Sequence, residues 1–424
     1  MDWEVWHSGD ILEMKVMNNL HKRTIIGMIT SSLLIGCAQN SQPLESKPEE
    51  SKPTELQRQL QLRIGAQSEF IELPEDEQRE NFAYTDRGVV PTVAARFETQ
   101  PVTSNDDAAD DPAIWIHPTD PKKSLILATD KKAGIGVYDL EGNLVQFVPA
   151  GLPNNIDLRQ GVTVGDWAGD LAVTSNREDN SVTLFSVVET GARIIGSFAA
   201  DIEPYGICLG RVSGVSADDA IVAFVTYKNG VVKGYQIQSV HPAVKAIQVG
   251  SLSFSSQLEG CVHQDKTNRL FVGEEGAGIW QLKTHLSLDG TIDGPSEGIF
   301  EAPTQVDSVG ELTGLVADVE GVALYDNGEQ QYLIASSQGN DSYAVYDAAS
   351  PYDFRGRFRI GASETSGVDG AQETDGIEAN SAAMGERFPL GIFVVQDGFN
   401  APIGTSQNFK VVDWRDIARA LELP

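Results

Sequence analysis

The chain of 424 residues is poor in the residues that form zinc sites and disulfide frameworks. It has three cysteines and six histidines, and neither type shows the spacing of a metal site. Cys208 and Cys261 each closely follow a recurring glycine that is described below. We expect both to be small buried residues, and whether they form a disulfide stays open.

Several catalytic signatures are also missing. The sequence has no Arg-His-Gly-x-Arg motif for a histidine nucleophile, no Cys-x5-Arg loop and no Walker-type glycine loop. These absences argue against histidine phosphatases, cysteine phosphatases and P-loop enzymes. A Gly-x-Ser-x-Gly elbow is absent as well. A Ser-His-Asp arrangement stays open, because its members can lie anywhere in a sequence.

Positive charge is scarce. The chain has 31 lysines and arginines against 61 aspartates and glutamates, which gives a formal net charge of −30. An acidic exterior repels polyanions, so we expect no nucleic-acid partner. The same exterior attracts divalent cations, and clustered carboxylates are the ligands that Ca²⁺ prefers.

The N-terminal apolar run 24–36 is shorter than the about 20 residues that a membrane-spanning helix needs. Lys22 and Arg23 precede it, and the sequence Leu-Ile-Gly-Cys ends it at Cys37. This is the pattern of a secretory signal, and its end resembles a bacterial lipobox. We expect the chain to be exported and anchored to a bacterial membrane, at the outer membrane or cell surface, by a lipid on Cys37. An ordinary signal peptide with an incidental cysteine is the alternative.

Three regions are therefore expected. Residues 1–37 form the signal region with its lipobox, and the true start is Met17, because the acidic segment before it does not suit a signal peptide. Residues 38–88, which begin rich in Ser, Gln, Pro, Glu and Lys, form a tether and N-terminal extension. Residues 89–424 form the folded domain. The only membrane contact expected is the lipid on Cys37, and later release outside the cell is the second outcome.

The folded region is rich in glycine and in short apolar runs. The chain has 41 glycines, and runs of Val, Ile and aromatics broken by Gly, Asn and Asp are typical of strands. A short unit, which we call a head, recurs six times before an apolar run. The heads are Asp110-Asp111-Pro112, Arg159-Gln160-Gly161, Pro204-Tyr205-Gly206, Leu258-Glu259-Gly260, Val319-Glu320-Gly321 and Thr374-Asp375-Gly376.

The spacing of the heads predicts the fold. The intervals of roughly 45 to 61 residues lie in the range of propeller blades. A second apolar run follows each head and, in most units, a third. We therefore predict an all-β fold, a monomeric six-bladed β-propeller with antiparallel blades. A pair of β-sandwiches would not restart with one unit six times, and β-helix repeats are much shorter.

The heads also predict a site. The innermost strand of each blade faces the central channel, so the six head side chains meet at one mouth. These are Asp111, Arg159, Tyr205, Glu259, Glu320 and Asp375. The turn after each second strand should lie nearby, and these turns contain Lys131, Lys132, Arg177, Lys228, Glu274, Glu275, Gln338, Asn340 and Asp397. Bases come from the first three blades, and acids come mainly from the last three.

Such a mouth suits phosphate chemistry. Crowded carboxylates repel each other unless cations hold them, and ligands that are all oxygen favour Ca²⁺ or Mg²⁺ over zinc. Guanidinium and ammonium groups beside such cations suit phosphate. The residues thus indicate metal-assisted hydrolysis of a phosphate ester. The alternative is that the acids cap loop amides and the bases are solvated.

Several motifs resemble those of the β-propeller phytases, over nearly all of 98–414. The most specific are 107–115, DAADDPAIW, and 154–159, NNIDLR. ASSQGN at 335–340, TDGI at 374–377, QDG at 396–398 and NFK at 408–410 are similar as well. The resemblance implies a secreted, calcium-dependent phosphomonoesterase of the 3-phytase type. Such an enzyme releases phosphate stepwise from myo-inositol hexakisphosphate (phytate), bound as its calcium complex, through a calcium-activated water.

The resemblance also implies residue roles. Several calcium ions would bind Glu98, Asp107, Asp110, Asp111, Glu259, Glu274, Glu320 and Asp375. Cleavage would involve Lys228, Tyr205, Arg159 and Glu259, and phosphate binding would involve Lys131, Lys132 and Arg159. The sequence departs from the family pattern at Tyr227 and Asn229, which flank Lys228, and at Gln160-Gly161. These departures bear on the shape of the substrate pocket. A propeller that binds calcium and an anion without turnover, or a calcium-dependent propeller hydrolase of another ester, is the alternative.

Overall fold

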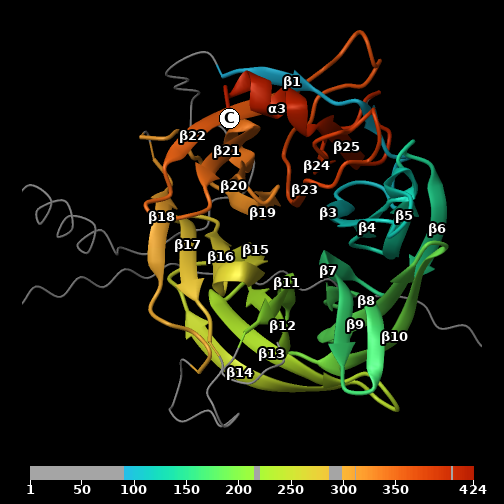
Figure 1. Ribbon diagram of the computed structural model, residues 1–424, viewed down its shortest axis with the longest axis vertical. Coiled ribbons are helices and arrows are strands. Elements are labelled where there is room, and N and C mark those ends of the chain that lie inside the picture. Colours follow the sequence, from blue (N-terminus) through green and yellow to red (C-terminus); the bar gives the residue numbers. More distant parts are fainter. Residues whose placement is uncertain (1–89, 214–219, 286–297, 311, 403) are drawn as a thin grey trace, which may run out of the picture. The chain divides into compact units, whose positions relative to one another are not determined.

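The computed structural model describes residues 90–424, except 214–219, 286–297, 311 and 403. The predicted signal region with its lipobox and the whole of the predicted tether and N-terminal extension, 38–88, lie outside the described residues and stay predictions. Six antiparallel sheets surround a central axis (Figure 1). The prediction of an all-β, six-bladed propeller is confirmed. Within the described part of the chain, no helix is long and apolar enough to cross a membrane.

Each of the first three blades has four strands that follow one another along the chain. Blade one comprises β3 (Ala109–Trp115), β4 (Leu125–Asp130), β5 (Gly134–Tyr138) and β6 (Leu144–Pro149). Blade two comprises β7 (Pro153–Val164), β8 (Trp167–Asn176), β9 (Ser181–Val188) and β10 (Gly191–Ala199). Blade three comprises β11 (Pro204–Val212), β12 (Ala220–Tyr227), β13 (Val231–Ser239) and β14 (Lys245–Ser253).

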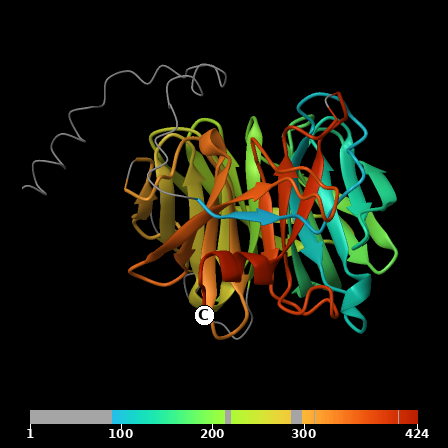
Figure 2. The ribbon, with the colours of Figure 1, turned by 90° about the horizontal axis from the view of Figure 1, so that it is seen from above.

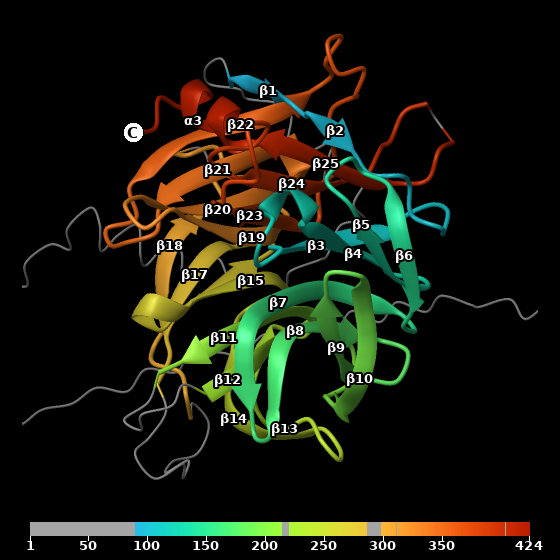
Figure 3. The same ribbon diagram turned by 45° about the vertical axis from the view of Figure 1, so that its right-hand side comes forward.

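Blade four again has four consecutive strands, whereas blades five and six each take one strand from the N-terminal part of the domain. Blade four comprises β15 (Leu258–Gln264), β16 (Arg269–Glu274), β17 (Gly278–Lys283) and β18 (Thr304–Ser308). Blade five comprises β19 (Val319–Asp326), β20 (Gln331–Ser337), β21 (Ser342–Asp347) and β22 (Phe354–Gly361), with β1 (Thr92–Ala94) added in parallel at its outer edge (Figure 2). Blade six comprises β23 (Ile377–Asn380), β24 (Ile392–Asp397), β25 (Asn408–Asp413) and, as its outer strand, β2 (Phe97–Glu98) (Figure 3).

Helical segments are few and short among the described residues. Three 3-10 turns lie at Pro121–Lys123, Asp265–Thr267 and Gln338–Asn340. The helix α3 (Trp414–Ala420) follows β25, and the Asp413 side chain caps it by accepting from the Arg415 amide. Trp414 stacks on Tyr325 of blade five, with ring centroids 3.6 Å apart. The C-terminal segment is thereby attached to the neighbouring blade.

The apolar core is divided among the boundaries between blades. One buried cluster fills each of the six boundaries, including the boundary between blades six and one, where Phe409 packs with Ile126. Since each fully buried side chain of this size contributes about 1.5–3 kcal/mol, every boundary is stabilised by packing. The propeller is therefore a rigid frame that holds the inner strands at fixed spacing.

In blades one to five, the inner strand begins with a β-bulge, and the position of this bulge shows which residue is the head. In blades one to five, two residues are skipped in the pairing of the first two strands. The first skipped residue is Asp110 in blade one and Asn154 in blade two. The prediction that Asp111 and Arg159 occupy the head position is therefore wrong in register. In blades three to five the predicted head is the first skipped residue, and in blade six Asp375 precedes Ile377 by two residues, as Tyr205 precedes Ile207 in blade three.

Close packing between neighbouring blades explains why the heads contain glycine. A Cβ added to Gly206 would lie 1.9 Å from the Glu259 carbonyl oxygen, and one added to Gly260 would lie 2.2 Å from that of Glu320. Blades three and four therefore approach the head of the next blade through this glycine. Blade one instead has Asp111 here, and its carboxylate accepts from the Ile156 amide of blade two at 2.9 Å.

The two cysteines that follow the heads of blades three and four are paired. Cys208 in β11 and Cys261 in β15 form a disulfide, and both are buried. The structure thus answers the question that the sequence left open. The bond links the inner strands of two different sheets.

Candidate active site at the channel mouth

Head and turn residues line one pocket at the mouth of the channel. Its walls are formed by Asp107, Lys131, Arg177, Tyr205, Lys228, Ala317, Asp318, Glu320, Gln338, Gly339, Glu373, Asp375, Gln396, Gly398 and Gln407. The six head side chains are Asp110, Asn154, Tyr205, Glu259, Glu320 and Asp375. They come together because each occupies the same place in its blade. Polar groups therefore line nearly the whole mouth.

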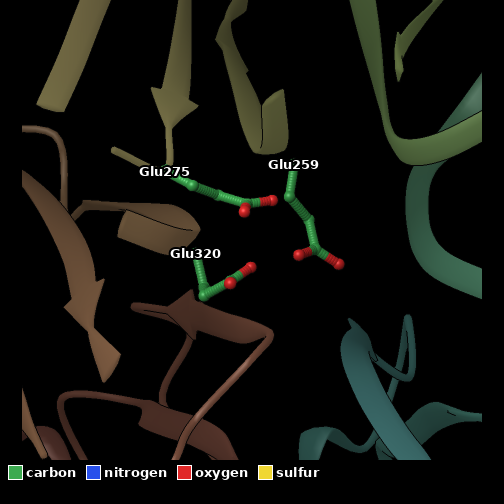
Figure 4. Close-up of side chains that lie close together, drawn as sticks. All are labelled: Glu259, Glu275 and Glu320. Atoms are coloured by element: carbon green, nitrogen blue, oxygen red, sulfur yellow. The ribbon is translucent and has the colours of Figure 1, made fainter. Parts of the chain in front are cut away.

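Three glutamates converge on the acidic side. Glu259, Glu275 and Glu320 each offer an oxygen, and these atoms lie within 4.8 Å of one another (Figure 4). All three side chains are buried. The Glu320 Oε2 atom is buried and has no hydrogen-bond partner among the described residues. Because an unpartnered buried carboxylate oxygen is costly, this cluster fits a bound cation.

Burial and mutual repulsion disfavour the charged state of the cluster. Burial, followed by the charge of Glu259, raises the pKa of Glu275 to about 9. The same two causes raise the pKa of Glu320 well above its ordinary value. Without a cation, these groups therefore retain protons. A divalent ion with oxygen ligands would replace those protons.

A second group of charges joins blade six to blade one. The Lys131 Nζ atom lies 3.3 Å from Asp110, 3.1 Å from Asp375 and 2.7 Å from the exposed Asp107. Burial raises the pKa of Asp375 to about 7, although Lys131 opposes the shift. The Asn154 amide links this group to the glutamates, because its Nδ2 lies 3.3 Å from Asp110 Oδ1 and 2.8 Å from Glu259 Oε1.

The basic side of the pocket comes from Lys131 of blade one together with side chains of blades two and three. Lys228 lies over the Tyr205 ring, with its Nζ 4.3 Å from the ring centroid, and Arg177 lines the same pocket. Burial, and then nearby acids, raise the pKa of the Tyr205 phenol well above its ordinary value, so it stays a hydrogen-bond donor. The pocket therefore holds these cationic donors together with Glu320 of the glutamate cluster.

Arg159 lies elsewhere. Its guanidinium bonds Asp157, at 3.0 Å, and Asp265, at 3.2 Å, and its Nη2 donates to the His263 carbonyl. It lies five residues beyond the head Asn154 along the inner strand and does not line the pocket. The placement of Arg159 at the mouth is therefore wrong, and the roles in cleavage and phosphate binding lose their geometric basis.

Three other predicted residues have protein partners away from the pocket. Lys132 is exposed and donates to the Asn105 carbonyl at 2.7 Å. Glu274 accepts from Ser256 and from the Trp280 indole. Asp111 lies in the layer below the heads. Their predicted roles, including calcium binding by Glu274 and Asp111, stay predictions.

Glu98 belongs to a separate acidic group. The fully buried Lys410 ammonium contacts Glu98, Asp369 and, at 3.0 Å, Asp397. Asn400 Oδ1 lies 3.2 Å from the same nitrogen. The structure thus gathers Glu98 with these acids around a lysine, and its predicted calcium role stays a prediction.

Sequence reasoning named Arg177 and Glu275 as turn residues but gave them no role, and it missed Asn154. A usable signal was present for Asn154, since Asn154-Asn155 precedes Ile156 as Tyr205-Gly206 precedes Ile207. Glu275 had a weaker signal, because nothing in the sequence separates it from Glu274. The choice between two adjacent turn residues depends on which side chain points inward.

With the geometry established, the chain can be compared with known proteins. The model of the family described as phytase matches residues 79–423. This chain belongs to the phytase family. The 3-phytase of Bacillus subtilis (strain 168) is 37% identical to this phytase over 347 residues, which is 78% of this chain and 86% of the relative. The expectation of a phytase, an enzyme that hydrolyses phytate, is therefore confirmed.

Two solved structures resemble this phytase more distantly. The β-propeller domain of Cps50 (Swd1) from Myceliophteria thermophila is 11% identical, with a TM-score of 0.39 over 72% of this chain and 83% of that one. BBS1N, solved in complex with ARL6DN, is 10% identical, with a TM-score of 0.41 over 70% and 77%. We draw nothing about the site from either likeness.

The two arginines should respond differently to substitution. We expect Arg177→Ala to raise the KM for phytate about 10- to 100-fold, because it removes a charged donor from the pocket. Arg159→Ala should leave KM nearly unchanged but lower the free energy of unfolding by about 1.5–3 kcal/mol, because it removes the charged partner of two partly buried carboxylates. Phosphate-release kinetics and urea unfolding of both variants test this. The opposite pattern would return Arg159 to the substrate site.

Proposed function

We propose that this phytase depends on several calcium ions and releases phosphate stepwise from phytate bound as its calcium complex. Calcium at the mouth would activate the attacking water and shield the charge of the phosphoryl group. The observation that carries the proposal is the buried cluster of Glu259, Glu275 and Glu320, whose member Glu320 lines the same pocket as cationic side chains. An enzyme of the 3-phytase type, as the Bacillus relative is named, fits this arrangement.

The chain's own residues divide the work of the site. Glu259, Glu275 and Glu320 would hold calcium, and Asp375 and Asp110 would add oxygen ligands where Lys131 now contacts them. Lys228, Arg177 and the Tyr205 hydroxyl would bind the phosphate oxygens of the substrate. Because these donors are fixed by the frame, they stabilise charge that develops during the reaction without reorganising.

The proposal also includes export of the enzyme, a lipid anchor and a monomeric state. The signal-like segment before Cys37 supports export and a lipid anchor. We treat the propeller as a monomer, since the six blades close on themselves and each boundary between them is filled. Mass spectrometry of the mature N-terminus, and the mass of the propeller in solution, test these two points.

The test of the function is phosphate release with calcium titrated from chelated to millimolar. Phytate, a simple phosphomonoester and a lactone are offered in parallel to the mature domain. We expect release from phytate that rises with calcium and little turnover of the other two. Turnover that is indifferent to chelation would overturn the calcium dependence. Calcium binding without release from any ester would favour a non-catalytic propeller.

A further inference from the structure

The disulfide lies directly below the site. Cys208 follows the head Tyr205 by three residues in β11, and Cys261 follows the head Glu259 by two residues in β15. These strands belong to different sheets, so no ladder of backbone hydrogen bonds joins them. The bond therefore links two blades at the layer just beneath their site residues.

This boundary is where the basic side of the pocket meets the acidic side. Blade three supplies Lys228 and Tyr205, and blade four supplies Glu259 and Glu275. At the other boundary between the two sides, from blade six to blade one, the ion pairs of Lys131 with Asp110 and Asp375 connect the charges directly. Between blades three and four, a covalent bond is present instead.

Noncovalent contacts at this level are modest and not special to the boundary. The Thr226 hydroxyl of blade three donates to the Glu259 carbonyl at 2.6 Å. A similar contact joins Ser175 to the Tyr205 carbonyl and Ser336 to that of Thr374. A hydroxyl contact of this kind thus occurs at several boundaries, and the disulfide is an additional link, two residues beyond Glu259 on the inner strand of blade four.

We propose that the Cys208–Cys261 disulfide is a positioning element of the site, which fixes the spacing between the basic side chains of blade three and the glutamates Glu259 and Glu275 that blade four contributes to the cluster. The inference rests on the proposed calcium-dependent function. Without the bond, the boundary stays packed, because both cysteines lie in a larger apolar cluster with Phe224, Val272 and others. The propeller then stays folded, but the ligands must be brought to the right spacing at a cost in cation affinity.

The experiment compares the oxidised enzyme with Cys208→Ala/Cys261→Ala. Terbium luminescence, with calcium as competitor, gives the midpoint of cation binding at a temperature where both proteins are folded. We expect a midpoint weakened about tenfold or more, the loss typical when support of metal ligands is removed. The KM for phytate at saturating calcium should rise too. Cys208→Ser/Cys261→Ser is the second variant.

The matched control is Leu270→Ala. Leu270 belongs to the same buried cluster but pairs with His263, at the end of the blade away from the head. This substitution should lower the melting temperature while the terbium midpoint stays within about twofold, because a cavity in the core costs stability. A general loss of stability is thereby separated from a loss of positioning.

Each outcome decides the inference. Equal midpoints for the double variant and the oxidised enzyme, with only a lower melting temperature, overturn it. If neither double variant folds, the native enzyme is reduced and its two free thiols are counted, and an unchanged midpoint then overturns it as well. If the oxidised enzyme binds neither terbium nor calcium, the proposed function fails first, and the inference fails with it.

Discussion

Lys228→Ala is expected to reduce phosphate release from phytate by about 10²- to 10³-fold, the loss typical when one donor to developing charge is removed. Lys228 lies over the Tyr205 ring on the basic side of the pocket, opposite the buried glutamates. Its ammonium is therefore placed to bind a phosphate oxygen where negative charge grows. The effect should fall on kcat as well as on KM, because the charge is largest in the transition state.

The control is Lys245→Ala in the same blade. Lys245 lies in the outer strand β14 and is exposed, so its removal changes the net charge equally without touching the mouth. We expect its activity and melting temperature to match the parent enzyme. Steady-state kinetics at saturating calcium, with near-ultraviolet circular dichroism as a check of folding, decide the matter. An active Lys228→Ala enzyme would show that Lys228 takes no part in the reaction.

The sequence was sufficient for the blade count but not for the register of every blade. Glycine marks a head wherever the next blade's carbonyl comes too close for a Cβ, as at Gly206 and Gly260. Blades one and two have Asp111 and Asn155 at that place, so a search that relies on glycine slips there. Gly161 is the next glycine of blade two, and an assignment of Gly161 as the head glycine places Arg159 at the mouth.

The site itself was predictable as a division of charge. Bases of blades one to three and the head acids of blades five and six line one pocket, and Glu259 and Glu275 of blade four join Glu320 in the buried cluster. Which acid points inward was not predictable at the turn of blade four, because neighbouring residues face opposite sides and Glu274 and Glu275 differ by one position. The disulfide was likewise undecidable, since cysteines 53 residues apart pair only if the fold brings two strands together.

Removal of calcium is expected to lower the melting temperature, and most strongly at alkaline pH. In the ion-free protein, burial raises the pKa of Glu275 to about 9 and that of Asp375 to about 7. In the unfolded chain, the pKa values of the same groups are about 4. Between these limits, the folded state binds more protons than the unfolded state, so the free energy of unfolding falls as pH rises from about 4 to about 9.

Calcium should cancel this slope, because a bound cation replaces the protons that the carboxylates otherwise retain. A site filled at about 1,000 times its Kd adds about 4 kcal/mol, which is about 6 °C in a domain of this size. Calorimetry at about pH 5, 7 and 9 should therefore show that the difference in melting temperature between the calcium-loaded and the chelated protein grows as pH rises. Glu275→Gln should reduce the slope of the ion-free protein, since the amide does not titrate. If the chelator leaves the melting temperature unchanged at every pH, the glutamate cluster is neutralised by protons alone. That result would contradict the calcium proposal.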